Sequence, residues 1–299
     1  MILYPSLPSS LISFNNTTQT PPYHCVPRKT PQKQHLHLLS ASNPCSCGRR
    51  LFLQTAASTA FLPICPSLAS HSPSDYLGVL QRVHPPRPDW YEEFYASVLN
   101  TSMESYEAEI AGYKLQLFDN LLEKAKKILE IGIGTGPNLK YYAGHTDVEV
   151  FGVDPNQKME KYARAAAVNA GLPPANFNFI HAVGEAIPLP DASVDAVVGT
   201  LVLCSVKNVN LTLKEVKRVL KPGGLYIFIE HVAAKDGTVM KLAQILLDPL
   251  QELVVDGCHL TRETGKEISE AGFSKLVLSK EFISNIPLIN PHVYGIAYK

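Results

Sequence analysis

The fold of this chain is decided by the stretch Lys127-Ile128-Leu129-Glu130-Ile131-Gly132-Ile133-Gly134-Thr135-Gly136-Pro137-Asn138. The apolar run before the glycines predicts a buried parallel strand, covered on both faces, that ends in an acidic residue. The glycines allow the backbone to turn sharply and to approach a ligand that a Cβ atom would exclude. A helix that begins just after them would aim free N–H groups and a positive dipole end at that ligand. The stretch therefore predicts a strand, a ligand-binding turn and a helix.

The spacing of the glycines distinguishes between two ligands. A dinucleotide-binding turn carries glycines at its first, third and sixth positions. Here the glycines are Gly132, Gly134 and Gly136, and the sixth position holds Pro137. This pattern after Glu130 disfavours NAD and favours S-adenosylmethionine (SAM), whose ammonium group suits an acidic residue at the end of a strand. A βα turn without a ligand remains the alternative until partner residues are found.

Asp154 is the first such partner. It ends a second apolar, β-branched strand at 148–154, one βα unit after the glycine turn, which brings it to the same edge of the sheet. A carboxylate there can accept both hydroxyl protons of a ribose, which is chemistry common to NAD and SAM sites. A lone Asp154 could be only a helix cap. Together with Glu130 and the glycines, it strengthens the prediction of a nucleoside-bearing ligand.

Strands and helices alternate along the rest of the chain. This alternation predicts an α/β fold, with a doubly wound, mostly parallel sheet and helices on both of its faces. The segment 73–126 is expected to be helical, to pack against the sheet and to close the ligand mouth, with helices over 91–99 and 106–127. Lys221-Pro222-Gly223-Gly224 predicts a stop and a turn. The further strands are expected at 178–182, 193–201, 225–229, 275–279 and 293–298, and the further helices at 139–142, 157–170, 211–220, 239–255 and 262–271.

The first 72 of the 299 residues differ in composition from the rest. They contain no acidic residue and are rich in Ser, Thr, Pro, Gln and His, as is typical of a disordered organelle transit leader. Arg49-Arg50, followed by an apolar stretch at 55–65, resembles a twin-arginine thylakoid signal. We therefore predict a chloroplast location, in the stroma, at the thylakoid or on the plastoglobule surface, with the lumen as a refinement. The chain divides into this leader, the helical segment 73–126 and an α/β domain at 127–299.

Charge and cysteine content exclude some functional classes. The chain has 27 basic and 27 acidic residues, and five of the basic ones lie in the leader, which leaves 22 basic against 27 acidic residues. A mildly acidic body disfavours nucleic-acid binding. Beyond the leader the only cysteines are Cys204 and Cys258, and a disulfide between them stays open. No cysteine pair has the spacing of a metal site, so the sequence predicts no metal centre.

Five motifs in order resemble the class I SAM-dependent methyltransferases over residues 105–299: the glycine stretch at 129–136, Asp154, Gly184-Glu185, Asp195 and Lys221-Pro222-Gly223-Gly224. The resemblance implies a seven-stranded sheet whose last strand is antiparallel and lies next to the fifth. It also implies a role for ten residues around SAM. Glu130, Gly132, Gly134, Gly136, Asp154 and Pro155 would bind its methionine and ribose parts, Gly184 and Glu185 would flank the adenine, and Thr200 and Leu201 would line the cofactor through backbone groups.

A closer resemblance lies in the stretches 200–208, 230–234 and 256–263, which are similar to the methyltransferase-like seven family of membrane-associated thiol methyltransferases. It implies methyl transfer from SAM to a small lipophilic acceptor, with a thiol favoured. The alternatives are C- or O-methylation of a plastid quinone or isoprenoid, and a non-catalytic SAM-fold binding protein. The resemblance further implies peripheral association with a plastid membrane or lipid droplet, and we expect a monomer.

His231 is the candidate catalytic residue. A thiol with an unperturbed pKa near ~8.5 needs a nearby base or positive field to become a thiolate. His231 follows the fifth predicted strand, and a neutral imidazole titrates near ~6.5. The alternative is a buried, hydrogen-bonding histidine at a strand end. Weaker candidates are Cys204, Asp248, Asp256 and His259, and Asp195 is expected to be structural.

Overall fold

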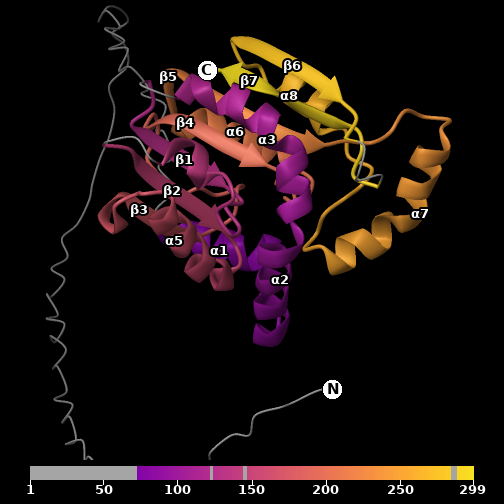
Figure 1. Cartoon of the computed structure of the whole chain (residues 1–299), viewed down its shortest axis with the longest axis horizontal. Coiled ribbons are helices and arrows are strands. Elements are labelled where there is room, and N and C mark those ends of the chain that lie inside the picture. The colour runs from indigo at the N-terminus through magenta and orange to yellow at the C-terminus, as the bar shows by residue number, and fades with distance from the viewer. Residues whose placement is uncertain (1–72, 122–123, 144–146, 284–287) are drawn as a thin grey trace, which may run out of the picture. The chain divides into compact units, whose positions relative to one another are not determined.

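The computed structural model describes residues 73–121, 124–143, 147–283 and 288–299. The leader predicted at 1–72 lies outside the described residues, so its targeting role stays a prediction. A seven-stranded sheet with the order β3-β2-β1-β4-β5-β7-β6 forms the centre of the described part, with helices along it (Figure 1). The sheet and its flanking helices confirm the predicted α/β fold.

The glycine stretch begins in the middle of this sheet. β1 (Lys127–Ile131) pairs in parallel with β2 (Glu149–Asp154) on one side and with β4 (Val194–Thr200) on the other. β3 (Phe177–His181) extends the parallel sheet beside β2, and β5 (Leu220–His231) extends it beside β4. Because parallel strands all end at one edge, the loops after β1, β2, β4 and β5 meet there.

The last two strands run the other way. β7 (His292–Tyr298) lies between β5 and β6 (Lys275–Glu281) and is antiparallel to both. The mixed sheet, with its final strand inserted beside the fifth, is the arrangement that the class I resemblance implied.

Helices cover both faces of the sheet because β1 is apolar on both sides. Ile128 packs into one core cluster, together with residues of α3 (Glu104–Phe118), α4 (Leu139–Tyr142) and α5 (Glu160–Asn169). Leu129 and Ile131 pack into a second cluster with α6 (Val209–Val219) and α8 (Thr264–Glu270). No helix among the described residues has both the length and the hydropathy needed to span a membrane. The helices after β1 are α4 (Leu139–Tyr142), α5 (Glu160–Asn169), α6 (Val209–Val219), α7 (Val239–Val254) and α8 (Thr264–Glu270), with short 3₁₀ turns at Gln157–Met159 and Pro174–Asn176.

Three helices precede the sheet: α1 (Pro73–Val83), α2 (Asp89–Ser102) and α3 (Glu104–Phe118). The prediction of one helix over 106–127 is wrong at its end, because α3 stops at Phe118 and a 3₁₀ turn follows. The Asn120 side chain explains the stop, since its Nδ2 donates to the carbonyls of Gln116 (3.2 Å) and Leu117 (3.0 Å). Figure 1 shows α2 and α7 standing away from the helices that cover the sheet.

The predicted turn at 221–224 is also wrong, because these residues belong to β5. The pairing of β4 with β5 shifts register between Val194 and Ala196. This irregularity accommodates Pro222 and a Gly223 with φ of 77°, so the chain passes through them without leaving the sheet.

Candidate active site

Two adjoining cavities lie among the loops at the carboxyl ends of the parallel strands. The first cavity encloses about 780 Å³ and the second about 1000 Å³ of empty space, mouths included, which is ample for small-molecule ligands. Asp154 and Glu185 line the first cavity, whereas Cys204, His231 and Cys258 line the second. Six residues line both, so the cavities meet there: Tyr95, Leu99, Gly132, Gly134, Leu201 and Ser205.

The glycines of the turn have different roles: Gly134 borders the cavities, whereas Gly136 packs against the core. Gly134 has φ of 52° and its N–H donates to Asp154 Oδ2 at 2.9 Å. A Cβ atom added to Gly134 would meet only the Gly132 carbonyl, at 4.0 Å, so it would project into open space. Gly136 has φ of 79°, and its Cβ would lie 2.7 Å from Leu139 and 3.1 Å from Ala166. Gly136, which lines neither cavity, therefore allows close packing against α4 and α5.

Asp154 is held at the end of β2 with its carboxylate pre-oriented. Its Oδ2 accepts from Gly134 N, and its Oδ1 accepts from Asn156 N at 2.9 Å. Burial raises the pKa of Asp154 to about 6, although the two backbone hydrogen bonds oppose this shift. The group is therefore ionised at neutral pH and has lone pairs left for a ligand in the first cavity.

Glu130 reaches the site indirectly. Its Oε1 accepts from Asn138 Nδ2 at 2.7 Å, and the Tyr142 hydroxyl donates to its Oε2. Burial raises the pKa of Glu130 to about 7. Asn138 Nδ2 also donates to Thr200 Oγ1, at 2.9 Å, and Thr200 lines the second cavity. Glu130 itself lines neither cavity, so it supports the site through Asn138 and Thr200.

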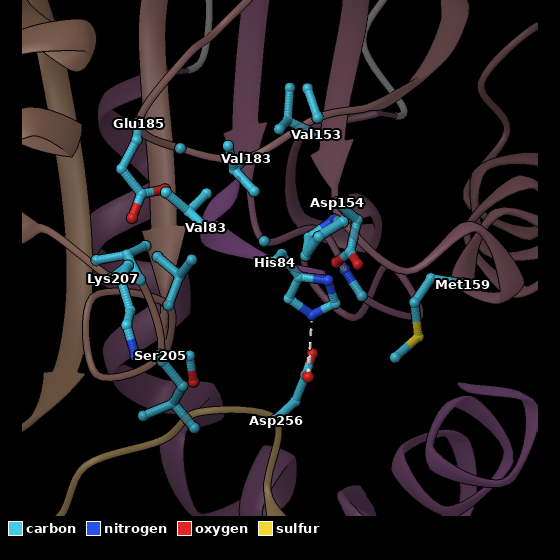
Figure 2. Close-up of a pocket in the computed structure, with 18 of the residues that line it drawn as sticks. Val83, His84, Val153, Asp154, Met159, Val183, Glu185, Ser205, Lys207 and Asp256 are labelled. Atoms are coloured by element: carbon cyan, nitrogen blue, oxygen red, sulfur yellow. Dashed lines mark hydrogen bonds and ion pairs between the residues drawn. The ribbon is translucent and has the colours of Figure 1, made fainter. Parts of the chain in front are cut away.

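The opposite wall of the first cavity comes from the loops after β3 and β4. Figure 2 shows Glu185 across the cavity from Asp154. Glu185 is buried, and its Oε1 accepts from Asn208 N at 2.9 Å. Pro155 and Gly184 line the same cavity. The structure thus brings together the four residues predicted around the ribose and the adenine.

The end of β4 carries backbone strain where the two cavities meet. Leu201 has φ of 52°, in the left-handed region that non-glycine residues rarely adopt. Its N–H donates to Ile229 O at 2.8 Å, which holds this conformation in place. Strained residues of this kind cluster at ligand-binding sites. Leu201 lines both cavities, and its predicted role in lining the cofactor through backbone groups stays a prediction.

A contact that sequence reasoning missed spans the first cavity. His84 Nε2, between α1 and α2, lies 3.0 Å from Asp256 Oδ1 in the loop after α7 (Figure 2). Arg87 also approaches Asp256 Oδ1, at 3.3 Å. Burial acts to lower the pKa of His84, but the hydrogen bond and charge of Asp256 raise it overall. No motif marks His84, because its partner is 172 positions away in the sequence.

His231 lies in the wall of the second cavity beside two cysteines. Its Nε2 is 3.2 Å from Cys258 Sγ, and all three side chains are buried. Proximity to Cys204, together with His231 and Gln251, lowers the pKa of the Cys258 thiol, whereas the neighbouring Cys258 sulfur and burial raise that of Cys204. Both cysteines are free thiols. The structure therefore surrounds the predicted catalytic histidine with two sulfur atoms.

Two of the weaker candidates line a cavity, Cys204 the second and Asp256 the first, whereas Asp195, Asp248 and His259 line neither. Asp248 accepts from His259 Nδ1 at 3.2 Å and from Thr261 N at 3.1 Å, so it orders the loop after α7. Asp195 lies at the other end of β4, where Lys127 N (2.8 Å) and Lys221 Nζ (2.6 Å) donate to it. Its position is structural.

Comparisons with known proteins identify the family of the chain. Residues 129–228 match the family described as a methyltransferase domain. The human thiol S-methyltransferase TMT1A is 44% identical over 203 residues, which cover 65% of this chain and 81% of TMT1A. The thiol S-methyltransferase TMT1B of Rattus norvegicus is 44% identical over 176 residues, which cover 58% of this chain and 70% of TMT1B.

Solved structures share the fold. A chain from the complex between the Haloferax volcanii Trm112 methyltransferase activator and a methyltransferase superposes with a TM-score of 0.54 and 17% identity. The superposition covers 71% of this chain and 99% of the other. At this identity the likeness shows the fold alone.

Proposed function

The chain belongs to the family of thiol S-methyltransferases, and from this premise we propose that it methylates the sulfur of a small, lipophilic thiol. The protein is a SAM-dependent methyltransferase, and SAM is its methyl donor. The observation that carries the proposal is the pair of adjoining cavities, one suited to the nucleoside of SAM and the other lined by sulfur, imidazole and apolar groups.

The first cavity is proposed to hold the nucleoside. The ionised Asp154 accepts the two ribose hydroxyl protons, and the adenine lies between Gly184 and Glu185. The methionine part then follows the glycine turn, past Gly134 and the backbone of Leu201. Because Gly134 and Leu201 line both cavities, this orientation aims the sulfonium methyl group at the second cavity.

The second cavity is proposed to hold the acceptor. Apolar side chains form much of its wall, including Leu99, Met103, Val255 and Ile289, which favours a lipophilic molecule. SAM already carries an activated methyl group, so catalysis requires mainly that a nucleophile be aligned with the methyl–sulfur bond. Positioning of this kind can supply effective molarities of order 10⁵ M or more.

The acceptor thiol must lose its proton before it attacks. Among the ionisable groups of this wall, Glu107 is held by Lys114 Nζ at 2.7 Å, and burial raises the pKa values of Tyr95 and Tyr106 well above their usual range. The acceptor thiol is therefore proposed to lose its proton beside the cluster of Cys204, His231 and Cys258. The thiolate then bonds to the methyl carbon, and the electron pair of the broken bond returns to the sulfur of SAM.

A panel of acceptors, in which each thiol is matched by its oxygen analogue, tests the proposal. The purified full chain is incubated with methyl-labelled SAM and with alkyl and aryl thiols, their oxygen analogues and a set of quinols. We expect label in the thioether products and little in the alcohols, because sulfur is the better nucleophile once deprotonated. Asp154→Ala should abolish transfer, whereas the exposed Asp236→Asn should not change it. Turnover of quinols without turnover of any thiol would replace the proposal by C- or O-methylation.

A lipid surface is the proposed source of the acceptor. Five apolar residues form one stripe on α7, and each is more than half exposed: Val239, Leu242, Leu246, Leu250 and Leu253. Contiguous exposed apolar surface of this kind marks an interaction site, and an amphipathic helix can lie in a membrane interface. Gln251 and Val255, at the end of the same helix, line the second cavity, so a lipid-dissolved thiol has a short path to it.

The plastid remains the proposed compartment. The proposal is supported by the acid-free, Ser-rich composition of residues 1–72. Mass spectrometry of the N-terminus of the protein from isolated plastids is expected to find a start near residue 72. Recovery of the protein only outside plastids, or with Met1 intact, would contradict it.

A further inference from the structure

Three potential metal ligands converge in the wall of the second cavity. Cys204 follows β4, His231 ends β5, and Cys258 follows α7, yet one ligand atom from each lies within 4.8 Å of the other two. All three side chains are buried, and all three line the cavity. Two thiols and one imidazole are a ligand set typical of zinc.

The spacing of these atoms suits a single ion. In a tetrahedral zinc site the Zn–S and Zn–N bonds of about 2.3 Å and 2.0 Å place neighbouring ligand atoms about 3.5 to 3.8 Å apart. Here His231 Nε2 and Cys258 Sγ are 3.2 Å apart, and no pair exceeds 4.8 Å. Small side-chain rotations are therefore enough to place the three atoms around one ion. Three protein ligands leave the fourth position open, as in catalytic zinc sites.

Hydrogen-bond donors lie beside both sulfur atoms, and Cys204 Sγ, as a thiol, itself donates to Leu201 O at 3.3 Å. Gln251 Nε2 donates to Cys258 Sγ at 3.6 Å, and Ser205 Oγ lies 3.6 Å from Cys204 Sγ. N–H and O–H donors of this kind orient and stabilise the ligands of a metal. Among the described residues, the buried His231 Nδ1 has no hydrogen-bond partner. A metal on Nε2 would fix the proton of the ring on this Nδ1.

The charge of the residues that line the second cavity also favours a bound cation. No lysine or arginine stands among the described residues that line the second cavity. Among these residues only His231 could carry a positive charge, so two buried thiolates would keep at least one negative charge without a cationic partner, which is costly in a low-dielectric site. A divalent ion neutralises them. It also supplies the positive field that an incoming thiol needs, because a thiol that coordinates such an ion is deprotonated outright.

We propose that Cys204, His231 and Cys258 bind a zinc-class divalent ion whose open position receives the acceptor thiol. The acceptor role rests on the proposed thiol S-methylation, whereas the metal site does not. On coordination the acceptor releases its proton to solvent. The bound sulfur then forms a bond to the SAM methyl carbon, the methyl–sulfonium bond breaks, and its electron pair stays on S-adenosylhomocysteine. The neutral thioether is a weaker ligand than the thiolate and leaves the ion.

Metal content tests the site without any methyl acceptor. The full chain, expressed with zinc and desalted, is expected to retain about one zinc ion per chain by elemental mass spectrometry. Exchange for Co²⁺ should give thiolate-to-cobalt charge-transfer bands and the intense visible bands of a four-coordinate ion. Cys204→Ser, Cys258→Ser and His231→Gln should lower zinc retention at least tenfold. The matched control is Cys45→Ser/Cys47→Ser, which removes the other closely spaced cysteines and should retain the ion.

Calorimetric titration with SAM verifies that each variant is folded. The proposal is overturned if the folded, SAM-binding wild type retains no zinc and gives no cobalt–thiolate bands, or if only the control variant loses the ion. A disulfide between Cys204 and Cys258, found by peptide mapping of the freshly purified, unreduced protein, would also overturn it.

Thiol addition tests the open position separately. Dodecanethiol in detergent is expected to shift the visible cobalt bands and to displace no protein ligand. An unchanged spectrum would overturn the open position. A bound ion together with no methylation of any thiol would support the metal site and refute the proposed acceptor, so the two failures are distinguishable.

Discussion

His84 Nε2 and Asp256 Oδ1 are 3.0 Å apart and join the segment before α2 to the loop after α7. Both residues line the first cavity. The contact therefore closes one side of the first cavity with one segment that precedes β1 in the sequence and one that lies between β5 and β6.

Breaking this contact should weaken SAM binding. For Asp256→Asn we expect the Kd of SAM to rise about fivefold, since a charge-assisted hydrogen bond worth about 1 kcal/mol is lost. Because the pKa of His84 is raised in the folded protein, its charged form is present at low pH and is lost as the pH rises through that value. The difference between wild type and variant should therefore shrink at alkaline pH. Calorimetry measures both, with Asp236→Asn as the exposed control. An unchanged Kd at pH 6 would contradict the closing role.

Protonation of Asp154 should weaken SAM binding at acidic pH. Its pKa of about 6 means that the carboxylate is ionised at pH 7.5 and becomes protonated as the pH falls through 6. A protonated group accepts fewer ribose hydroxyl protons, so the Kd of the wild type should rise below pH 6. Asp154→Asn should weaken SAM binding by about 1.5 to 3 kcal/mol at pH 7.5, and the Kd of this variant should depend little on pH below 6. Wild-type affinity in the variant would remove Asp154 from the site.

Substitution of Gly134 and of Gly136 by alanine should have different effects on SAM binding and stability. Gly134→Ala places a methyl group in the cavity space, so it should abolish SAM binding at a stability cost of about 1 to 2 kcal/mol. Gly136→Ala drives a methyl group against Leu139 and Ala166, and overpacking adds about 1 to 3 kcal/mol to the same backbone strain. Its melting temperature should fall by roughly 5 to 15 °C. Thermal unfolding and calorimetry separate the two, and equal stability of both variants would contradict the assignment.

Asp195 should contribute to stability only above its own pKa. Partial burial acts to raise this pKa, but hydrogen bonds from Lys221 Nζ and the N–H groups of Lys127 and Lys126 lower it overall. A depressed pKa stabilises the fold above the unfolded value near ~3.9, and the effect is lost as the pH falls through the folded value. Asp195→Asn should cost about 1 kcal/mol at pH 7, after solvent screening, and less near pH 3. Denaturant unfolding at the two pH values tests this, and a cost that does not depend on pH would refute it.

The stripe on α7 should carry membrane affinity. Leu246→Asp/Leu250→Asp removes two exposed apolar side chains, each worth about 1.5 kcal/mol or more when buried in lipid. Partition of the full chain onto phosphatidylcholine vesicles should fall at least tenfold in a flotation assay. Leu115→Asp changes an equally exposed leucine on α3 and should have no effect. Equal losses in both variants would point to general destabilisation instead.

Much of the fold could be predicted from sequence because its signals are local. The seven strands follow apolar, β-branched runs, and their alternation with helices implies a parallel sheet. The two errors also have local causes. Asn120 ends α3 by binding its last carbonyls, and the register shift beside Val194 keeps Pro222 and Gly223 within β5. Such effects depend on one side chain or one irregular pair, which periodicity does not record.

The candidate site was predictable where residues of one βα unit form it. Asp154 and Gly134 lie at the ends of neighbouring strands, so their contact follows from one βα unit. His84 and Asp256 were missed as partners because no local pattern links residues so far apart. Glu130 was expected to bind the cofactor, and only the structure shows Asn138 and Tyr142 occupying its carboxylate.

The sequence by itself determined the strand, the glycine turn and the class of methyl donor, because backbone freedom at Gly132, Gly134 and Gly136 is a property of the chain at that point. Only the tertiary structure decided which side chains line the second cavity. Cys204, His231 and Cys258 have no metal-site spacing, and they meet because β4 and β5 are neighbours and the loop after α7 folds back over their ends. Side chains from three segments converge only after the sheet has formed, and that convergence is what defines the second cavity.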